Sequence, residues 1–343
     1  MNGTISRDRL IHELLSSPEP SIRWKVRVGI LQEPRDAAKV ERLEREIRGS
    51  PRVRALLTGD PTRPSGVRPR HPYAKWQGAH WVLAALADIG YPQHDPQLAP
   101  LVDRSLELWL GPYYQRMTQT TGGTEARRPS GIPVIRGRAR SHASQQGNAL
   151  WSLTTLGLGD ERVEGLVRLL RQWQWPDGGW NCDRDPEATV SSFMETLLPM
   201  RGLALRARST GDSDAAGSAR RASEVFLQRQ LFRRRSNGAL IRPDYLKLHY
   251  PLYWHYDILG ALRGLGEVGR LDDTRASEAL DLLEAAELPD GGWAAQARYY
   301  RVAPTFRPGS EFVDWGGVGP RRRNEWVTVD ALRVLREAGR IRL

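Results

Sequence analysis

The sequence predicts an all-α protein whose helices form a double ring, an (α/α)6 toroid with inner and outer helices in one domain over residues 1–343. Two observations predict it. The pentapeptide Pro-Asp-Gly-Gly-Trp occurs at 176–180 and again at 289–293, and each copy closes an apolar stretch of helical period. The 3.6-residue period also dominates the rest of the chain, whereas the alternation typical of strands is scarce.

The more apolar helices should form the inner ring, because a helix that is apolar on most sides is buried. Local signals set their ends: Ser21 can cap the first, Gly90 ends the second, and Pro186 suits the start of the fourth. The expected inner helices lie near 22–32, 76–89, 144–156, 187–206, 253–268 and 324–338.

The helices between them carry many charges and should form the outer ring. Asp160 and Asp272-Asp273 provide N-caps for two of them. Residues 115–140, polar and rich in Gly and Arg, are expected to form a long insertion loop. The expected outer helices lie near 37–47, 95–110, 161–173, 213–231 and 274–288, and a helix at 5–16 would close the circle.

The chain is 40% hydrophobic, enough for a large core, and carries a net charge of +11. Its basic clusters, at 136–140, 233–235 and 321–323, are short and do not interleave with aromatic residues as a base-stacking surface would. We therefore expect no nucleic-acid partner. One of these clusters is better suited to binding an anionic group of a substrate.

The sequence also bears on location. Residues 1–21 lack the apolar core of a signal peptide, and no apolar run reaches the roughly 20 residues that cross a bilayer. Cys182 is the single cysteine, which excludes a disulfide within the chain. We expect a cytoplasmic protein without a transmembrane segment. Peripheral contact with a membrane is compatible with this, and the oligomeric state is left open.

Repeats that end in Asp-Gly-Gly-Trp resemble the terpenoid cyclase and protein prenyltransferase superfamily, in particular the QW repeats of squalene-hopene cyclases. Residues 172–180 and 283–293 match the ends of such repeats, and weaker patterning extends over about 70–340. Residues 73–81 and 180–183 also resemble bacterial cyclase-like proteins. The resemblance implies a central cavity in which an isoprenoid or another apolar substrate reacts. The cyclases' Asp-x-Asp-Asp motif and the Asp-Asp-x-x-Asp pattern for magnesium and diphosphate are absent from the sequence.

Glu195 and Asp257 are the candidate acids, because they occupy the same level on two expected inner helices. Glu195 stands between apolar neighbours, and burial raises the pKa of a carboxyl group. Such a group can act as a general acid near neutral pH and start a cyclisation or isomerisation. The alternative is a buried Glu that pairs with an Arg or with a neighbouring helix.

Residues 249–257 are the densest polar and aromatic segment of the chain. Tyr253 and Trp254 offer ring faces that stabilise carbocations electrostatically. His255 is a further catalytic candidate, but it and Asp257 diverge by about 200° on a helix. One of the two is therefore expected to be structural if the helix includes both.

Further polar and aromatic side chains recur at the starts of the expected inner helices and in the loops before them, where they would line the cavity mouth. Gln77 with His80, and Gln145 with Asn148, share helix faces. The complete set of expected substrate-binding residues is Trp76, Gln77, His80, Gln145, Asn148, Ser192, Tyr253, Trp254, Asp314, Trp315, Asn324 and Glu325. Ser192 and Asn324 suit a capping role equally well.

Cys182 and Asp183 directly follow the first Gly-Gly-Trp, and Asp183 is also a catalytic candidate. In prenyltransferase beta subunits an Asp, a Cys and a His from separate repeats bind zinc, so the resemblance implies that Cys182, Asp183 and His255 would be the ligands of any metal. The spacing does not match that family's motif, and a lone Cys is more often a small buried hydrophobe. We expect no cofactor, since neither zinc nor magnesium is supported by a full motif.

Three functions follow. The first is a terpene cyclase-like enzyme acting on an apolar or partly polar small substrate. The second is a carbohydrate-active hydrolase or lyase, because α6/α6 rings also house paired carboxylates about 5–10 Å apart, as Glu195 and Asp257 could be. The third is a ring that binds a ligand or a protein without catalysis. An aromatic funnel favours the first, an open polar groove the second and a filled centre the third.

Overall fold

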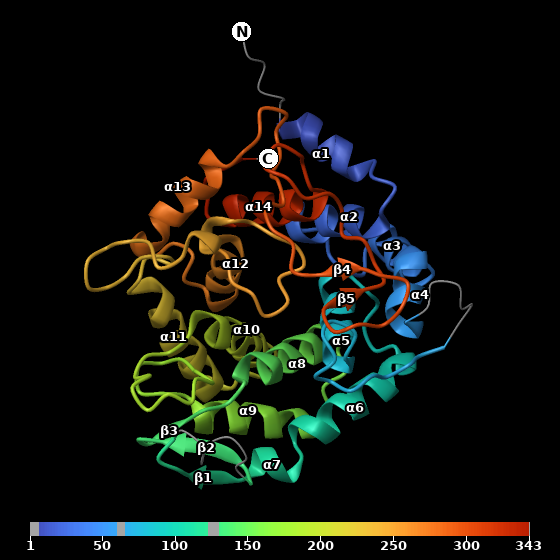
Figure 1. The fold of residues 1–343 in the computed structure, drawn as a ribbon. Helices are drawn as coiled ribbons and strands as arrows, with labels where there is room; N and C mark the ends of the chain where they lie inside the picture. Colours follow the sequence, from blue (N-terminus) through green and yellow to red (C-terminus); the bar gives the residue numbers. More distant parts are fainter. Residues whose placement is uncertain (1–6, 60–65, 123–129, 343) are drawn as a thin grey trace.

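The computed structural model describes residues 7–59, 66–122 and 130–342, and it confirms a mostly helical protein (Figure 1). The helical elements are α1 (Arg7–Leu15), α2 (Pro20–Trp24), the π-helix η1 (Lys25–Ile30), α3 (Ala38–Arg48), α4 (Pro51–Thr58), α5 (Ala79–Asp88), η2 (Pro96–Leu98), α6 (Ala99–Trp109), α7 (Pro112–Gln115), α8 (Ala143–Thr155), α9 (Arg162–Trp173), α10 (Phe193–Thr210), α11 (Ser213–Leu227), η4 (Pro243–Leu246), α12 (Ile258–Val268), η5 (Thr274–Ala276), α13 (Ser277–Ala285) and α14 (Glu325–Glu337).

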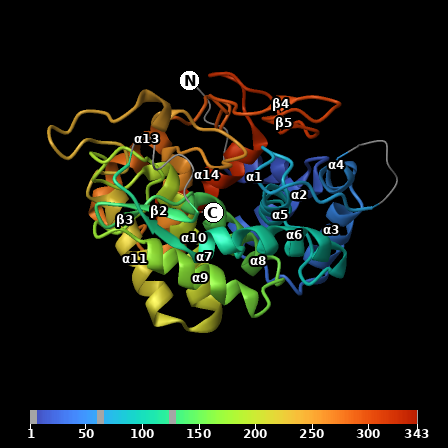
Figure 2. The same cartoon turned by 60° about the horizontal axis from the view of Figure 1, so that its bottom comes forward.

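Helices that follow one another in the chain pack as pairs: α2 with α3, α5 with α6, α8 with α9, α10 with α11, and α12 with α13. The helices α5, α8, α10, α12 and α14 also pack side by side in that order, and α14 packs on η1 (Figures 1 and 2). An ion pair between Lys25 of η1 and Asp88 of α5 joins the two ends of this series.

Burial differs between the two helices of the α8–α9 pair. All residues of α8 from Ala143 to Leu153 are buried, whereas α9 buries only one face. The backbones of α8 and α10 approach closely at Gly147, where an added Cβ would lie 2.3 Å from the nitrogen of Pro199. Only glycine allows this approach, which brings the N-terminal ends of both helices together.

The two Gly-Gly-Trp turns are built alike. The indole Nε1 of Trp180 donates to the carbonyl of Leu170 at 2.9 Å, and that of Trp293 donates to the carbonyl of Leu283 at 2.7 Å. Both indoles are completely buried. Each tryptophan therefore pins its turn to the helix that the turn terminates.

Three of the predicted helices begin later than expected. α5 starts at Ala79 instead of residue 76, so Gln77 precedes the helix and does not share a helix face with His80. α10 starts at Phe193 instead of residue 187, and α12 starts at Ile258 instead of residue 253. Asp257 has extended backbone angles and caps α12, so Tyr253, Trp254 and His255 lie in the preceding loop. These three residues are therefore not on a helical wall.

The insertion at 115–140 was expected as a loop, but its described part forms a small sheet of β1 (Met117–Gln119), β2 (Ile132–Ile135) and β3 (Arg138–Ala139). β1 is parallel to β2, and β2 is antiparallel to β3. All four residues of β2 are buried, which is consistent with a strand rather than an exposed loop. A second pair, β4 (Arg301–Val302) and β5 (Ser310–Glu311), lies in the connection before α14. None of the helices in the described ranges is both long and apolar enough to span a bilayer.

Candidate functional site

A narrow hollow, here called the central cavity, lies between α5, α8, α10, α12 and α14 and the loop before α12. Its volume is about 50 Å³, room for a few water molecules. Its aromatic lining consists of Trp81, Trp151, Tyr250, Tyr253 and Trp315. Of the residues predicted for the site, Asn148, Tyr253, Asp257 and Trp315 line it.

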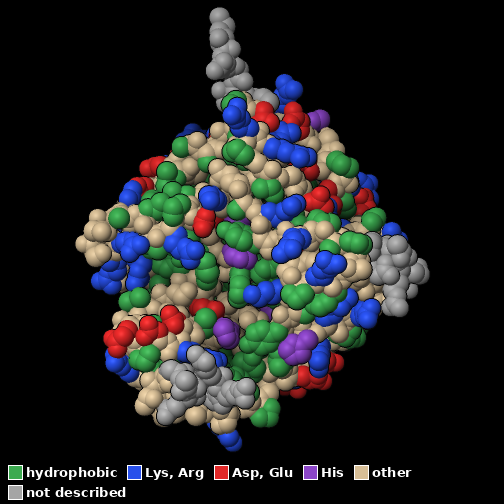
Figure 3. Space-filling view, viewed as in Figure 1, with side chains coloured by type: hydrophobic (Ala, Val, Ile, Leu, Met, Phe, Trp, Pro, Cys, Tyr) green, Lys and Arg blue, Asp and Glu red, His purple; other side chains and the backbone are tan. Residues whose placement is uncertain are grey.

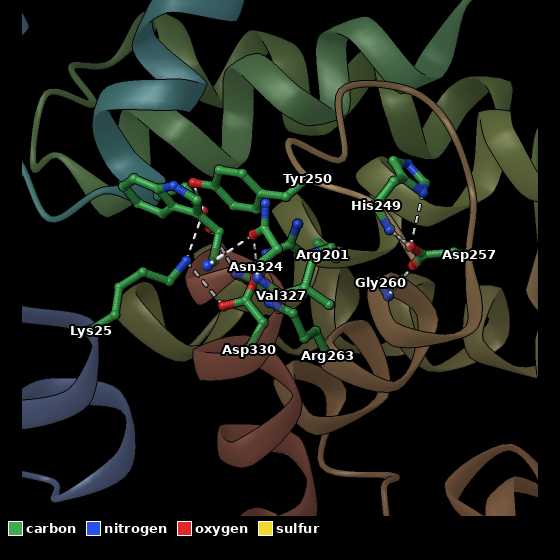
Figure 4. A network of polar contacts seen from close by, with 12 residues as sticks. Lys25, Arg201, His249, Tyr250, Asp257, Gly260, Arg263, Asn324, Val327 and Asp330 are labelled. Atoms are coloured by element: carbon green, nitrogen blue, oxygen red, sulfur yellow. Dashed lines mark hydrogen bonds and ion pairs between the residues drawn. The ribbon is translucent and has the colours of Figure 1, made fainter. Parts of the chain in front are cut away.

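An ionic cluster forms one wall of the central cavity (Figure 4). Lys25 and Arg263 each contact the carboxylates of both Asp88 and Asp330, at 2.6–2.9 Å. The hydroxyl of Tyr250 donates to Asp88 at 2.7 Å. Buried cations here hold the pKa of Asp88 well below its usual range although burial works to raise it. Asp88 is therefore a poor proton donor.

A larger cavity of about 550 Å³ lies on the other side of this cluster, where α5, α8, α12 and α14 end. Asp88, Trp151, Arg263 and Asp330 border both cavities. Its remaining lining is mixed and charged, with Glu267, Arg333, Arg336 and Glu337 among the side chains. The ionic cluster thus separates an aromatic hollow from a polar one.

Asp257 is held by the backbone. One carboxylate oxygen accepts from the N–H of Gly260 at 2.7 Å, and the other accepts from the N–H of His249 at 2.9 Å (Figure 4). The His249 ring lies 2.9 Å from the same carboxylate, and this contact raises the pKa of His249 against the effect of burial. Asp257 therefore caps α12 and orients a histidine at the rim of the central cavity.

Glu311 is an acid that the sequence patterns did not single out. It is 1% exposed in β5, and its Oε2 accepts from the hydroxyl of Tyr253 at 3.0 Å. Burial raises the pKa of Glu311 to about 7 against the lowering effect of hydrogen bonds from the Phe312 N–H and Tyr253. The Tyr253 ring lines the central cavity and stacks on Trp76, with centroids 4.1 Å apart. No helical or motif pattern marks Glu311, because it lies in a long connection.

Glu195 is buried, but at a different place. Its Oε2 accepts from the N–H of Ser144 at 2.9 Å, and its Oε1 lies 3.8 Å from Nδ1 of His142. The thiol of Cys182 is close to both, and the three donor atoms lie within 4.8 Å of one another. Burial, followed by the Glu195 carboxylate, raises the pKa of Cys182. Of the described residues, these are the ones whose grouping could hold a metal ion; Asp183 and His255 are not part of the group.

The other predicted residues have identifiable partners. Asn324 caps α14 through the N–H groups of Trp326 and Val327, whereas the side chain of Ser192 makes no capping bond to α10. Glu325 accepts from Ser17, and Asp314 accepts from the N–H of Gly316. Asp183 is exposed and accepts from the N–H of Asp185.

Several of the remaining predicted side chains lie in a cluster around Trp76. Its indole donates to the carbonyl of Tyr299, and Gln77 donates to Ser310 next to Glu311. The indole of Trp254 donates to His255, whose ring stacks on Tyr299. Burial lowers the pKa of His80 and of His255 to about 3, so both are neutral. Gln145 is buried in α8.

On the face shown in Figure 3, Lys and Arg side chains are spread among acidic and uncharged ones. Histidine and hydrophobic side chains gather near the middle of that face. Comparison of the sequence with models of known protein families and with curated proteins gives no match.

Proposed function

We propose that this protein is an acid–base enzyme for an apolar substrate, built as an (α/α)6 double ring that resembles the terpenoid cyclases. The proposal assigns the acid to Glu311, acting through Tyr253, instead of to Glu195 or Asp257. The hydrogen bond between the buried Glu311 carboxyl and the Tyr253 hydroxyl carries the proposal. A pKa of about 7 keeps much of Glu311 protonated at neutral pH.

The proton passes from Glu311 through Tyr253 to the substrate. In the acid form Glu311 donates to the Tyr253 oxygen, the reverse of the hydrogen bond described above, which frees the Tyr253 proton to face the cavity. An alkene carbon takes that hydroxyl proton, and Tyr253 takes the proton of Glu311, so that a carboxylate and a carbocation result. The rings of Trp81, Trp151 and Trp315 line the cavity and would stabilise that cation. Loss of a proton from the rearranged cation returns the acid to its starting state.

Two features support this assignment. Tyr253 has a φ of +47°, a conformation that residues other than glycine rarely adopt and that is found at functional sites. The acid, the phenol and the stacked Trp76 also come from three segments distant in sequence, and they meet only because of the fold. The cavity volume of about 50 Å³ is smaller than a prenyl chain, so the cavity has to widen when a substrate enters.

That small volume is also the observation that favours the alternative of a ring that binds a ligand without catalysis. The carbohydrate-active alternative gains no comparable support. Glu195 and Asp257 are both occupied by backbone N–H groups, and of the two only Asp257 lines the central cavity.

The test is turnover of polyprenyl substrates. Purified protein is incubated with squalene and with prenyl diphosphates, and products are identified by gas chromatography and mass spectrometry. Glu311→Gln should lower the rate by about 10²–10⁴-fold, the usual contribution of a general acid. Glu337→Gln, which changes a carboxylate of the larger cavity, is the control and should keep the rate. Turnover that survives Glu311→Gln, or no turnover of any of these substrates, contradicts the proposal.

A further inference from the structure

The cluster of His142, Cys182 and Glu195 lies outside the central cavity and plays no part in the proton transfer described above. Its donors are one imidazole, one thiol and one carboxyl group. A thiolate and a carboxylate together balance a divalent cation, and a mixed N, S and O set is typical of zinc. The three atoms are therefore chemically matched to one ion.

The backbone brings these donors together. A parallel bridge pairs Arg140 with Asn181, so that His142 and Cys182 follow two paired residues. The N–H of Ser192 donates to the carbonyl of Trp180 at 2.8 Å, which holds the start of α10, with Glu195, beside the same turn. The three ligands thus come from segments that are tied to one another by main-chain hydrogen bonds.

The geometry is close to that of a tetrahedral site. Bonds of about 2.0–2.3 Å place ligand atoms about 3.3–3.8 Å apart. The present separations of up to 4.8 Å require side-chain shifts of about 1 Å, within reach of rotation about the side-chain bonds. The Ser144 N–H already fixes one oxygen of Glu195, and such outer hydrogen bonds orient metal ligands.

The second repeat supplies an internal comparison. Trp293 corresponds to Trp180 and Thr328 to Thr196, because each tryptophan N–H donates to the threonine hydroxyl, at 3.0 and 3.2 Å. Counting from these anchors, Ala295 takes the place of Cys182 and Val327 takes the place of Glu195. The same turn is therefore built without a thiol or a carboxylate, so the turn itself does not require them.

We propose that His142, Cys182 and Glu195 bind one zinc ion or a similar divalent transition metal, with a fourth coordination position open. His142 has a side chain 40% exposed and Cys182 is half-buried, so water or a substrate can reach the ion. Three protein ligands with an open position are the arrangement of catalytic zinc sites, where the metal polarises a bound group. This site is independent of the Glu311 proposal.

The test uses the full chain, stripped with a chelator and titrated with Zn²⁺ by calorimetry and with Co²⁺ by absorption. Wild type should bind one equivalent, and the Co²⁺ form should show a thiolate charge-transfer band. Cys182→Ala, the residue of the second repeat, should remove the band. Both Cys182→Ala and His142→Ala should weaken Zn²⁺ binding by at least about 100-fold.

Two further variants keep the result interpretable. Glu195→Gln retains an oxygen for the Ser144 N–H but loses the charge, so it should fold and still bind zinc much more weakly. His71→Ala removes an exposed imidazole that stacks on Tyr73, whose ring contacts His142, and it should leave the affinity unchanged. A Co²⁺ spectrum without the thiolate band, or equal losses in His71→Ala and His142→Ala, overturns the proposal.

Discussion

The two Gly-Gly-Trp turns make the same hydrogen bonds, but the connections that follow them carry different functional side chains. In both turns the tryptophan N–H is bonded to a threonine of the next helix, and the tryptophan carbonyl accepts from the N–H of Ser192 or Asn324 at 2.8 Å. The first connection, 181–191, carries Cys182 close to α8. The second, 294–323, is longer and carries Glu311 to Tyr253.

The comparison separates what the fold requires from what a site requires. Residues with the same contacts in both copies, such as Trp180 and Trp293, serve the fold. Residues that differ at equivalent positions, such as Cys182 and Ala295, are free to serve chemistry. The first connection adds the half-buried thiol of Cys182, and the second adds the buried carboxyl group of Glu311. These two groups lie at different sites.

The largest expected effect on stability comes from the tryptophans that both turns share. Trp180→Ala and Trp293→Ala should each lower the free energy of unfolding by about 3–5 kcal/mol, because both indoles are completely buried. Denaturant unfolding of both variants measures this. Trp254→Ala, at a half-buried indole in a loop, is the control and should have a smaller effect. A loss below about 1 kcal/mol for either turn variant would break the equivalence of the repeats.

A smaller effect is expected from the acid of the second connection. Burial raises the pKa of Glu311 to about 7 in the folded protein from 4.5 for an unburied glutamate, so the folded state binds an extra proton between these values. Stability contributed by the protonated form is lost as pH rises from about 4.5 through 7. Glu311→Gln should therefore stabilise the protein by about 1–3 kcal/mol at pH 8 and change little at pH 4.

Unfolding curves of wild type and Glu311→Gln at the two pH values measure this difference. If Glu311→Gln changed the free energy of unfolding equally at pH 8 and at pH 4, the pKa of Glu311 would be that of an ordinary glutamate. The second connection would then carry no acid suited to catalysis.

The sequence predicted the helices well where the apolar period was strong, as in α8 and α9, and it predicted the burial of Glu195. It did not find Glu311 or His142, because both lie in non-helical segments whose positions depend on distant partners. Cys182 was grouped with His255, whereas the bridge between Arg140 and Asn181 brings His142 to it instead. Such pairing is non-local and leaves no periodic signal in the sequence.

The smallest expected effect is that of Cys182→Ala on the metal-free protein. Ala295 occupies the equivalent position of an intact turn, so the free energy of unfolding should change by less than about 1 kcal/mol. With zinc at 100 times the wild-type Kd, wild type should gain about 2.7 kcal/mol, because the ion binds only the folded state, and Cys182→Ala should gain at most about 0.4 kcal/mol. Melting curves with and without zinc compare the two. If Cys182→Ala lowered the free energy of unfolding by several kcal/mol without zinc, the Cys182 side chain would be needed for packing. The first turn would then depend on Cys182, although the second turn has Ala295 at the same position.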